Sequence, residues 1–507
     1  MITEIYTADF IGIDAYEIVV EVDSRVGMPG FHLVGMASVA VTEGRVRIRT
    51  AIENSGFHLK SKKVTVNLAP AEIRKDTTAF DLPIAIGVIA VDSSLSSEIF
   101  RNILFIGELG LDGTIRPVRG VLPITVAARN LGYKAIVVPR ENAREAALID
   151  GIDIKIADTL SQVMGCLNGL LDWDNAVSDQ FEEDDMEIPD FADVVGQKKA
   201  IRAMTVAASG GHNILMVGPP GSGKSMLARR LPGILPPMNQ TGSIECTTIY
   251  SVAGALSKTG LITRRPFRAP HHTVTSAGLV GGGPGPRPGE ISLAHNGVLF
   301  LDEILEFSRN TLETLRQPLE DGNVTITRAR GSINFPAKFQ LVAAMNPCPC
   351  GHFGDKKREC ICSQKTIMNY RNRLSGPLMD RIDIQVHVGS MSFSEIRAQR
   401  SASLSTSELR KMVLNGWKKQ LLRFGPSTSM DNAHMTGSMI KKYCTLDTET
   451  ESFLENAVEN NSMSVRSIDK ILKIARTVAD LDNSENIQFE HLKEAVTYRE
   501  IESEKII

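Results

Sequence analysis

The sequence GPPGSGKS, residues 218–225, decides the fold of the central part of this chain. It matches the pattern G-x-x-x-x-G-K-[ST] in full, follows the apolar run NILMV and precedes the helix-forming run MLARRL. A strand, a glycine-rich loop and a helix in this order form a phosphate-binding loop, in which backbone N–H groups at a helix N-terminus surround an anion. The stretch therefore predicts an α/β nucleotide-binding domain.

Two residues of this loop are expected to have different roles in binding ATP and its metal ion. Lys224 is expected to reach the β- and γ-phosphates of ATP, and Ser225 is expected to ligate Mg²⁺. The predicted nucleotide contacts are Gly218, Pro219, Pro220, Gly221, Ser222, Gly223, Lys224, Ser225 and Met226.

Two later apolar runs end in polar side chains that complete the predicted site. GVLFLDE places Asp302 and Glu303 at the carboxyl end of a predicted strand, where open α/β sheets bind ligands. Asp302 would hold Mg²⁺, and Glu303 would orient and deprotonate the attacking water. FQLVAAMN ends in Asn346, which would position water or sense the γ-phosphate, or alternatively begin an Asn-Pro turn.

The 507 residues are too many for one core, and their composition divides the chain into four parts. Residues 1–170 alternate β-rich runs such as KVTVNLAP with helical stretches such as VLPITVAARNLG, a mixed α/β pattern. Residues 171–190 carry nine acidic residues and no Lys or Arg, which predicts a linker. Residues 191–390 continue in βα units, and residues 391–507 show the helical periodicity of SVRSIDKILKIARTVADL.

Global features favour a cytoplasmic protein. The N-terminus has no basic start followed by an apolar run, so no signal peptide is expected, and no run of about 18 apolar residues predicts a membrane helix. Cys166, Cys246 and Cys444 are scattered, which favours reduced thiols. The net charge is −3, so any contact with nucleic acid must come from a local basic surface.

The order of these motifs resembles that of an AAA+ ATPase. VVGQ, the phosphate loop, FLDE, the strand that ends at Asn346 and SVRS occur in the order found in that family. RPFRAPHHTVTSAGLVGGG and RLSGPLMDRIDIQV resemble its magnesium-chelatase-like branch, and nearly the whole chain is similar to the ComM/YifB family within that branch. The resemblance implies an AAA+ core with a parallel sheet at residues 191–390 and a C-terminal helical lid at residues 391–507.

The resemblance also implies a ring, usually a hexamer, with ATP at the subunit interfaces. Arg381 in LMDRID would be the arginine finger that reaches the neighbour's γ-phosphate and neutralises charge in the transition state. Arg373 in YRNRLSG is the second candidate, and Arg466 in SVRS would be a second sensor on the same nucleotide. The alternative for any one of these arginines is a surface charge.

The N-terminal part resembles a Lon-type protease domain in GELGLDGTIRPVRGVLP and LGYKAIVVPREN, which implies a Lon-protease-like α+β fold. Lon-type enzymes use a serine and a lysine, and Ala79 and either Leu122 or Pro123 occupy those positions here. Without a hydroxyl and a nearby amine there is no activated nucleophile. We therefore expect a non-proteolytic scaffold for ring assembly or DNA, although Thr77 or Thr78 would supply a hydroxyl in a shifted alignment.

DNA would be contacted at a predicted hairpin. Alternating NVTIT and SINF flank a short turn with Arg328 and Arg330 at its tip. In the resembling family a hairpin at this position points into the central pore, where arginines could grip phosphates. TRRPFRAPHHT, with Arg264, Arg265 and Arg268, is a second candidate. For both segments, packing or subunit contact is an equal alternative.

The stretch NPCPCGHFGDKKRECICS, residues 346–363, holds Cys348, Cys350, Cys360 and Cys362. Four thiolates suit one tetrahedral Zn²⁺, with His352 as a substitute ligand, although C-x-C is tighter than the usual C-x₂₋₄-C spacing. A metal would fix a loop that has almost no apolar residues. Free thiols or a redox pair are the alternatives.

Three functions compete for this chain. The first is an ATP-driven hexameric DNA motor, a branch-migration helicase that acts with a recombinase partner in natural transformation. The alternative is a magnesium-chelatase-like or chaperone-like remodelling ATPase that acts on protein or metal insertion; the chelatase subunit usually lacks the Lon-like domain and needs dedicated partners. The third, a Lon-like protease, is argued against by Ala79. The expected cofactors are ATP, Mg²⁺ and, at the cysteine loop, Zn²⁺.

Overall fold

The fold is described from a computed structural model of the chain. The described residues are 2–35, 39–59, 62–72, 75, 77–93, 95, 97–176, 188–256, 260–283, 286–328, 331–355, 358–390, 404–425, 430–461 and 464–499. The central part of the predicted acidic linker, residues 177–187, and the first residues of the predicted lid, 391–403, lie outside them.

An eight-stranded mixed sheet forms the N-terminal lobe, in the order β10-β9-β8-β5-β1-β2-β4-β3. Its strands are β1 (Ile2–Ile11), β2 (Asp14–Arg25), β3 (Gly30–Val34), β4 (Lys63–Ala69), β5 (Ile103–Phe105), β8 (Ala135–Pro139), β9 (Asp153–Ala157) and β10 (Asp174–Asn175). The long antiparallel pair β1–β2 is in register with Ile5 opposite Val20, and both side chains are fully buried. A separate hairpin joins β6 (Glu108–Leu109) to β7 (Ile115–Arg116).

Helices cover this sheet: α1 (Val39–Asn54), α2 (Asp81–Ala90), α3 (Val121–Asn130), α4 (Ala143–Ala146) and α5 (Leu160–Leu167). Every residue of α2 is buried, because its sequence DLPIAIGVIA is apolar on all sides after Asp81. Its Gly87 lets the helix approach β2 closely, since a Cβ there would lie 2.6 Å from Val22 Cγ2.

A five-stranded parallel sheet forms the core, in the order β12-β15-β18-β11-β19. Its strands are β11 (Ile214–Val217), β12 (Phe267–Arg268), β15 (Val298–Leu301), β18 (Gln340–Met345) and β19 (Ile384–His387). Successive residues of β11 enter two different apolar clusters, Ile214 and Met216 one of them and Leu215 and Val217 the other. Both faces are therefore covered, which is why the strands read as unbroken apolar runs. The predicted mixed α/β class with a parallel sheet is confirmed.

The helices of the core are α6 (Lys198–Gly210), α7 (Lys224–Ile234), α8 (Gln240–Ala253), α9 (Ser276–Val280), α10 (Glu290–Leu293), α11 (Arg309–Glu313), α12 (Arg316–Asp321), α13 (Gln364–Arg371) and α14 (Gly376–Met379). Two small antiparallel pairs project from it, β13 (Gly281–Gly282) with β14 (Arg287–Pro288) and β16 (Asn323–Arg328) with β17 (Gly331–Pro336). The second pair is the hairpin that the sequence predicts.

The C-terminal part is helical, with α16 (Thr406–Phe424), α17 (Gly437–Tyr443), α18 (Thr448–Asn461), α19 (Val465–Leu481) and α20 (Phe489–Thr497). The amphipathic helix α19 buries Ile471, Ile474, Ala475 and Val478 against α16, α20 and α6. Among the placed residues, every helix is too short or too polar to span a lipid bilayer.

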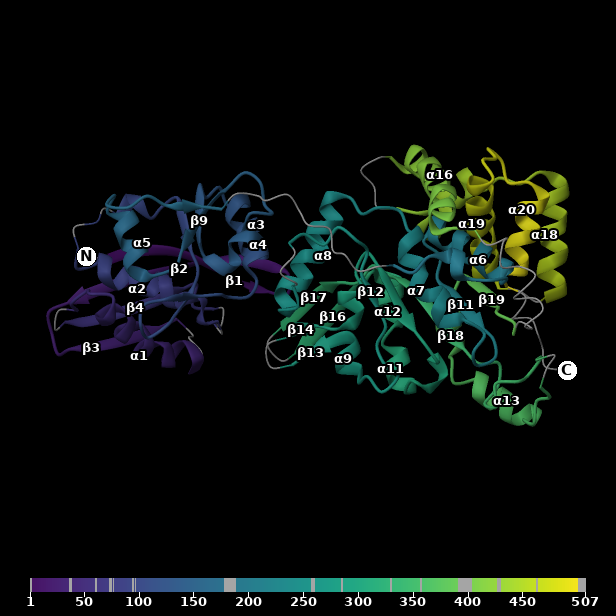
Figure 1. The fold of residues 1–507 in the computed structure, drawn as a ribbon, viewed down its shortest axis with the longest axis horizontal. Coiled ribbons are helices and arrows are strands. Elements are labelled where there is room, and N and C mark those ends of the chain that lie inside the picture. Colours follow the sequence, from purple (N-terminus) through teal and green to yellow (C-terminus); the bar gives the residue numbers. More distant parts are fainter. Residues whose placement is uncertain are drawn as a thin grey trace.

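The N-terminal lobe, purple to blue in Figure 1, lies beside the teal part of the core, with α3 facing α8. The Ser251 hydroxyl on α8 donates to the Glu145 carboxylate on α4. A second contact joins the turn between β1 and β2 to the β16–β17 hairpin, where a Cβ on Gly12 would lie 2.9 Å from Ile333 Cγ2. Gly12 has a φ of +67° and is buried, so the turn needs glycine for its backbone and for the close approach.

Candidate nucleotide-binding site

The phosphate loop connects β11 to α7 at the carboxyl end of the parallel sheet. Gly221 and Gly223 have φ values of +73° and +94°, a left-handed backbone that favours glycine. Gly218 has a different reason to be glycine, because a Cβ there would lie 2.1 Å from the Val388 carbonyl oxygen. The shape of the phosphate loop therefore depends on the left-handed backbone at two glycines and on close packing of Gly218 against the segment that follows β19.

Lys224, the first residue of α7, points its ammonium into this loop. Its Nζ donates to the carbonyls of Gly218 (2.7 Å) and Pro219 (2.9 Å) and to Asn346 Oδ1 (3.3 Å). Burial lowers the pKa of Lys224, and the nearby carboxylates of Asp302 and Glu303 oppose that shift. The ammonium thus lies where it can bind phosphate oxygens, and Asn346 is beside it.

Ser225 and Asp302 form the pair suited to Mg²⁺. The Ser225 hydroxyl donates to Asp302 Oδ2 at 2.5 Å, although the two residues come from different βα units. A hydroxyl and a carboxylate that converge beside a phosphate loop are hard oxygen donors of the kind Mg²⁺ prefers. Their placement fits the predicted metal ligands.

Glu303 follows directly and is held in an unusual conformation. Its φ and ψ are both 48°, in the left-handed region that few residues other than glycine adopt. Its N–H donates to Asp302 Oδ1 at 2.9 Å. Strained backbone of this kind is frequent at active sites, and here it turns the chain sharply between Asp302 and the short helix Ile304–Glu306.

Gln197 also supports the loop, although the sequence analysis gave it no role beyond its place in VVGQ. Its Nε2 donates to the carbonyls of Ser222 (3.3 Å) and Gly389 (2.7 Å), so it ties the phosphate loop to the segment after β19. Gln197 has a φ of +52°. The residue is 25 positions from Ser222 and 192 from Gly389, and no local pattern would have shown these contacts.

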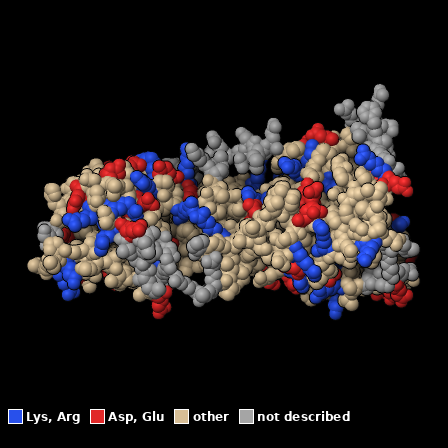
Figure 2. All heavy atoms as spheres, turned by 90° about the horizontal axis from the view of Figure 1, so that it is seen from below, with Lys and Arg blue, Asp and Glu red and all other residues tan. Residues whose placement is uncertain are grey.

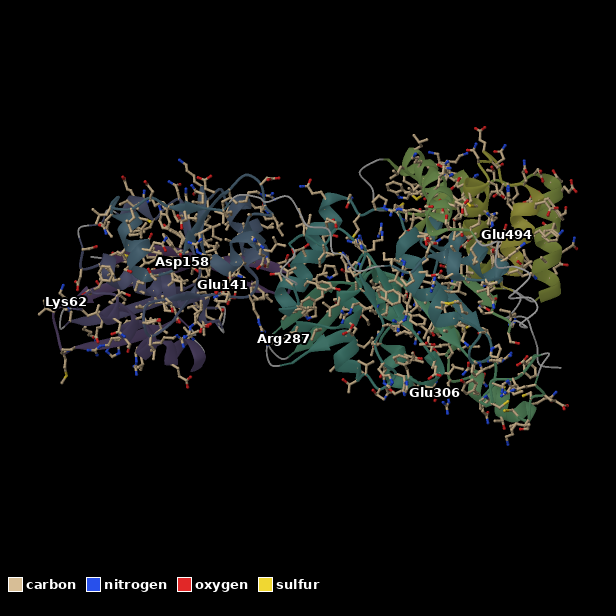
Figure 3. All side chains as sticks on the ribbon, viewed as in Figure 1. Lys62, Glu141, Asp158, Arg287, Glu306 and Glu494 are labelled. Carbon is tan, nitrogen blue, oxygen red and sulfur yellow. The ribbon has the colours of Figure 1, made fainter. Side chains whose placement is uncertain are left out.

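The two candidate finger arginines lie at opposite edges of the core. Arg381 precedes the amino end of β19, whereas the phosphate loop follows the carboxyl end of the adjacent parallel strand β11. Arg373 donates to the Leu305 carbonyl at 3.1 Å and lies 3.5 Å from Glu306, just after Glu303. Glu306 is labelled in Figure 3 at the lower edge of the core. Arg373 therefore belongs to the edge of its own nucleotide site, and Arg381 does not.

Arg466 lies beside the predicted finger. Its Nη1 is 3.8 Å from Asp380 Oδ2, and its side chain is 74% exposed. Arg381 itself donates to the Pro377 carbonyl at 2.7 Å and forms an ion pair with Glu320. Two cationic side chains thus share the edge of the core that is remote from the chain's own phosphate loop.

Comparison with known proteins places this arrangement in a family. The family model for magnesium chelatase subunit ChlI matches residues 190–396, and models for other parts of that subunit match residues 20–142 and 403–499. Competence protein ComM of Haemophilus influenzae is 41% identical over 500 residues, 98% of this chain and 97% of its own length. The uncharacterized protein YifB of Salmonella typhimurium is 39% identical over 502 residues, with the same coverage. The chain belongs to the ComM/YifB family.

Similarity to chelatase itself is weaker. The magnesium-chelatase 38 kDa subunit of Cereibacter sphaeroides is 26% identical over 174 residues, 31% of this chain and 52% of that subunit. Membership of a magnesium-chelatase-like AAA+ family indicates an ATPase that uses ATP and Mg²⁺.

This ComM/YifB protein gathers its four loop cysteines into one cluster. The ligand atoms of Cys348, Cys350, Cys360 and Cys362 all lie within 4.8 Å of one another. Three Sγ–Sγ distances are 3.3–3.6 Å, near the roughly 3.8 Å expected for a tetrahedron with 2.3 Å metal–sulfur bonds. Backbone N–H groups of His352 and Ile361 lower the pKa of Cys350, whereas burial raises the pKa of Cys360.

The cysteine loop also touches the phosphate loop. A Cβ on Gly351 would lie 2.5 Å from Pro220 Cδ, and Gly351 has a φ of +82°. His352, the predicted substitute ligand, instead has its Nδ1 3.3 Å from Asp355 Oδ2. Asp355 Oδ1 accepts from the Ser390 hydroxyl at 3.1 Å, beside the Gly389 carbonyl that Gln197 binds.

The residues at the predicted Lon-type positions lie within this lobe and pack or hydrogen-bond inside it. Ala79 is buried, its N–H donates to Thr77 Oγ1 at 3.2 Å, and the Thr78 hydroxyl donates to the Glu108 carboxylate. Leu122 and Pro123 are buried in the first turn of α3.

The predicted DNA contacts are only partly described. Arg328 ends β16 at the tip of the hairpin, and Arg330 lies outside the described residues. Arg265 is partly buried and donates to the carbonyls of Pro236 and Asn296, both at 2.6 Å. Arg268 forms a two-bond ion pair with Glu290 (2.7 and 2.8 Å). These contacts favour the packing alternative for Arg265 and Arg268. Arg264 remains a candidate DNA contact.

We predict that Gly218→Ala weakens nucleotide binding by roughly ten-fold or more, because forcing a methyl group against the Val388 carbonyl costs about 1–3 kcal/mol. Titration with a fluorescent ATP analogue measures this effect. Gly389→Ala is the matched control, since nothing lies within 4 Å of a Cβ at that position. Equal affinities for the two variants would contradict the role given to the close approach.

Proposed function

We propose that this protein is an ATP-driven ring motor, a hexamer, that branch-migrates DNA during recombination in natural transformation. The observation that carries the proposal is the separation of Arg381 from the phosphate loop of its own chain. The four residues of β19 span about 13 Å, so the two groups lie at opposite ends of the sheet. An arginine finger at Arg381 would have to serve a neighbouring protomer, with Arg466 beside it on the same nucleotide.

The residues of the site divide the chemistry between them. Lys224 and the loop N–H groups would bind the β- and γ-phosphates, and Ser225 and Asp302 would hold Mg²⁺, which shields phosphate charge. Glu303 would orient the attacking water and accept its proton, with Asn346 placed beside Lys224 to detect the γ-phosphate. Arg381 of the next protomer would neutralise charge that develops in the transition state.

The DNA part of the proposal is supported by a relative and by the hairpin. The Haemophilus influenzae relative is named competence protein ComM, which links that protein to competence. Lys and Arg are interspersed with Asp and Glu on the coloured surface in Figure 2, so DNA contact would depend on a local feature such as the β16–β17 hairpin rather than on the whole face. The N-terminal lobe, which we propose to be a Lon-like non-proteolytic scaffold, packs through Gly12 against strand β17 of that hairpin.

A remodelling ATPase is the second candidate. The matches of the core and of the C-terminal part to models of a magnesium chelatase subunit favour it. It would use the same hydrolytic site on a protein partner or in metal insertion.

We also propose that the four cysteines hold one Zn²⁺ as a structural support of the nucleotide site. The supporting observations are the sulfur cluster and its contact with Pro220 through Gly351. Fixing the cysteine loop would hold Pro220 and, through Asp355 and Ser390, the segment that Gln197 ties to the phosphate loop.

On a synthetic four-way junction, the wild-type protein is expected to move the branch point only with ATP and Mg²⁺. Glu303→Gln should keep ATP binding but lose roughly 10²- to 10⁴-fold in hydrolysis, since the group that accepts the proton is gone. Gel analysis of labelled junctions and a phosphate-release assay measure the two effects. If the wild-type protein neither binds junctions nor is stimulated by any DNA, the remodelling function takes the place of the motor.

Arg328→Ala combined with Arg330→Ala is expected to weaken DNA binding and to reduce DNA-stimulated ATPase activity. Each phosphate contact removed should lower the slope of log affinity against log salt by about 1. Arg410→Ala, on an exposed position of α16, is the control and should leave the slope unchanged. Intact affinity and stimulation in the hairpin variant would exclude the hairpin as the DNA contact.

Metal analysis should find about one zinc per chain in the purified protein. Cys350→Ser combined with Cys360→Ser should hold less than about a tenth of an equivalent and bind ATP more weakly, because Gly351 then no longer supports Pro220. Cys166→Ala, outside the cluster, serves as the control. If the purified wild-type protein contains no zinc before any chelation, the zinc proposal is wrong.

A further inference from the structure

The turn that carries Arg381 is held from the C-terminal helical domain. Lys470 of α19 donates from Nζ to the Ile382 carbonyl at 3.0 Å. Arg499, two residues after α20, donates from Nη1 to the same carbonyl at 2.5 Å. One backbone oxygen directly beside Arg381 thus accepts from two cationic side chains of another part of the chain.

Asp383 completes the hold on this turn. Its Oδ1 lies 3.1 Å from Lys470 Nζ, and its Oδ2 accepts from the Asn213 N–H at 3.0 Å. Burial opposes the charged form of Asp383, but Lys470 and His212 outweigh it and the net pKa is lowered, so the carboxylate stays ionised. Asn213 also donates from Nδ2 to the Arg381 carbonyl at 2.9 Å.

These contacts fix the backbone of residues 381–383, whereas the Arg381 side chain has weaker interactions. Arg499 is 1% exposed, and a buried cation or carboxylate is costly unless its partners stay in place. The Arg381 guanidinium donates to the nearby Pro377 carbonyl and pairs with Glu320. The side chains of Arg381 and Glu320 are 17% and 63% exposed, so solvent reaches the pair from the Glu320 side and weakens its contribution to stability. The side chain can therefore leave Glu320 while its Cα is kept in position.

We propose that Lys470 and Arg499 are positioning residues for Arg381, and that the C-terminal helical domain thereby sets the approach of the finger to the neighbour's nucleotide. This inference rests on the proposed function. Lys470 contacts Ile382 and Asp383, the two residues that follow Arg381, so it would act through Arg381 on the nucleotide of the next protomer. A displacement of about 1 Å at a reacting group can cost about 10²-fold in rate.

The test uses mixed assemblies of two full-length variants. Lys224→Ala offers a finger but cannot hydrolyse its own nucleotide, and Arg381→Ala holds nucleotide but offers no finger. Mixing them leaves active interfaces only where the nucleotide of the second variant meets the finger of the first. Recovery of ATPase activity on mixing establishes the shared site, and failure to recover any would overturn the proposed function itself.

Lys470→Met is then added to one variant at a time. In the finger-donating chain it should lower kcat by roughly 10- to 100-fold with KM for ATP unchanged. In the chain that already lacks Arg381 it should change nothing. Equal losses in both arrangements, or a loss only in the second, would overturn the positioning role.

A matched control lies one turn further along α19. Lys473 also donates from Nζ to a backbone carbonyl, that of Ala433 at 2.8 Å, but it does not contact the 381–383 turn in the described contacts. Lys473→Met should leave kcat unchanged in either chain, and Lys470→Arg should restore part of the activity. Similar melting temperatures for the two Met variants would show that the loss is not due to unfolding, and a similar loss of kcat in both would overturn the inference.

Discussion

The parallel alignment of five short strands is the constraint on which the rest of the structure depends. Because all carboxyl ends meet at one edge, side chains from three separate βα units converge there: Lys224 and Ser225, Asp302, and Asn346. The same alignment sends the amino end of β19, and with it Arg381, to the opposite edge. The parallel alignment thus separates the residues that would hold a nucleotide from those that would act on the nucleotide of a neighbouring protomer.

Buried charges are kept where partners compensate them. Lys224 is enclosed by loop carbonyls and Asn346, and the Asp383 carboxylate pairs with Lys470 and accepts from the Asn213 N–H. Such groups would cost several kcal/mol if their partners moved, so they favour one arrangement of loop and turn. Movement in the motor that we propose is then expected at pairs with one solvent-exposed partner, such as Arg381 with Glu320, which cost less to break than the buried pairs.

Sequence motifs predicted the residues of the candidate nucleotide site. Contacts between residues far apart in the chain became known only from the folded structure. The glycines, Lys224 and Ser225 stand in one local pattern, and the apolar runs before Asp302 and Asn346 identify strands, so their convergence follows from the parallel sheet. Gln197, the contact of Gly351 with Pro220, and the hold of Lys470 on Ile382 join residues far apart in the chain. The same limit applies to Arg265 and Arg268, whose partners Asn296 and Glu290 become visible only once the chain is folded.

The buried turn at Gly12 has a mechanical implication. The Gly12 backbone packs closely against Ile333 of the β16–β17 hairpin. A tilt of the hairpin would therefore either move the N-terminal lobe with it or break this contact. The lobe is therefore coupled to the hairpin by packing and not only by the chain that connects it to the core. In the ring that we propose, each lobe would add viscous drag to the movement of its hairpin, and contacts between neighbouring lobes would limit how far adjacent hairpins can move independently.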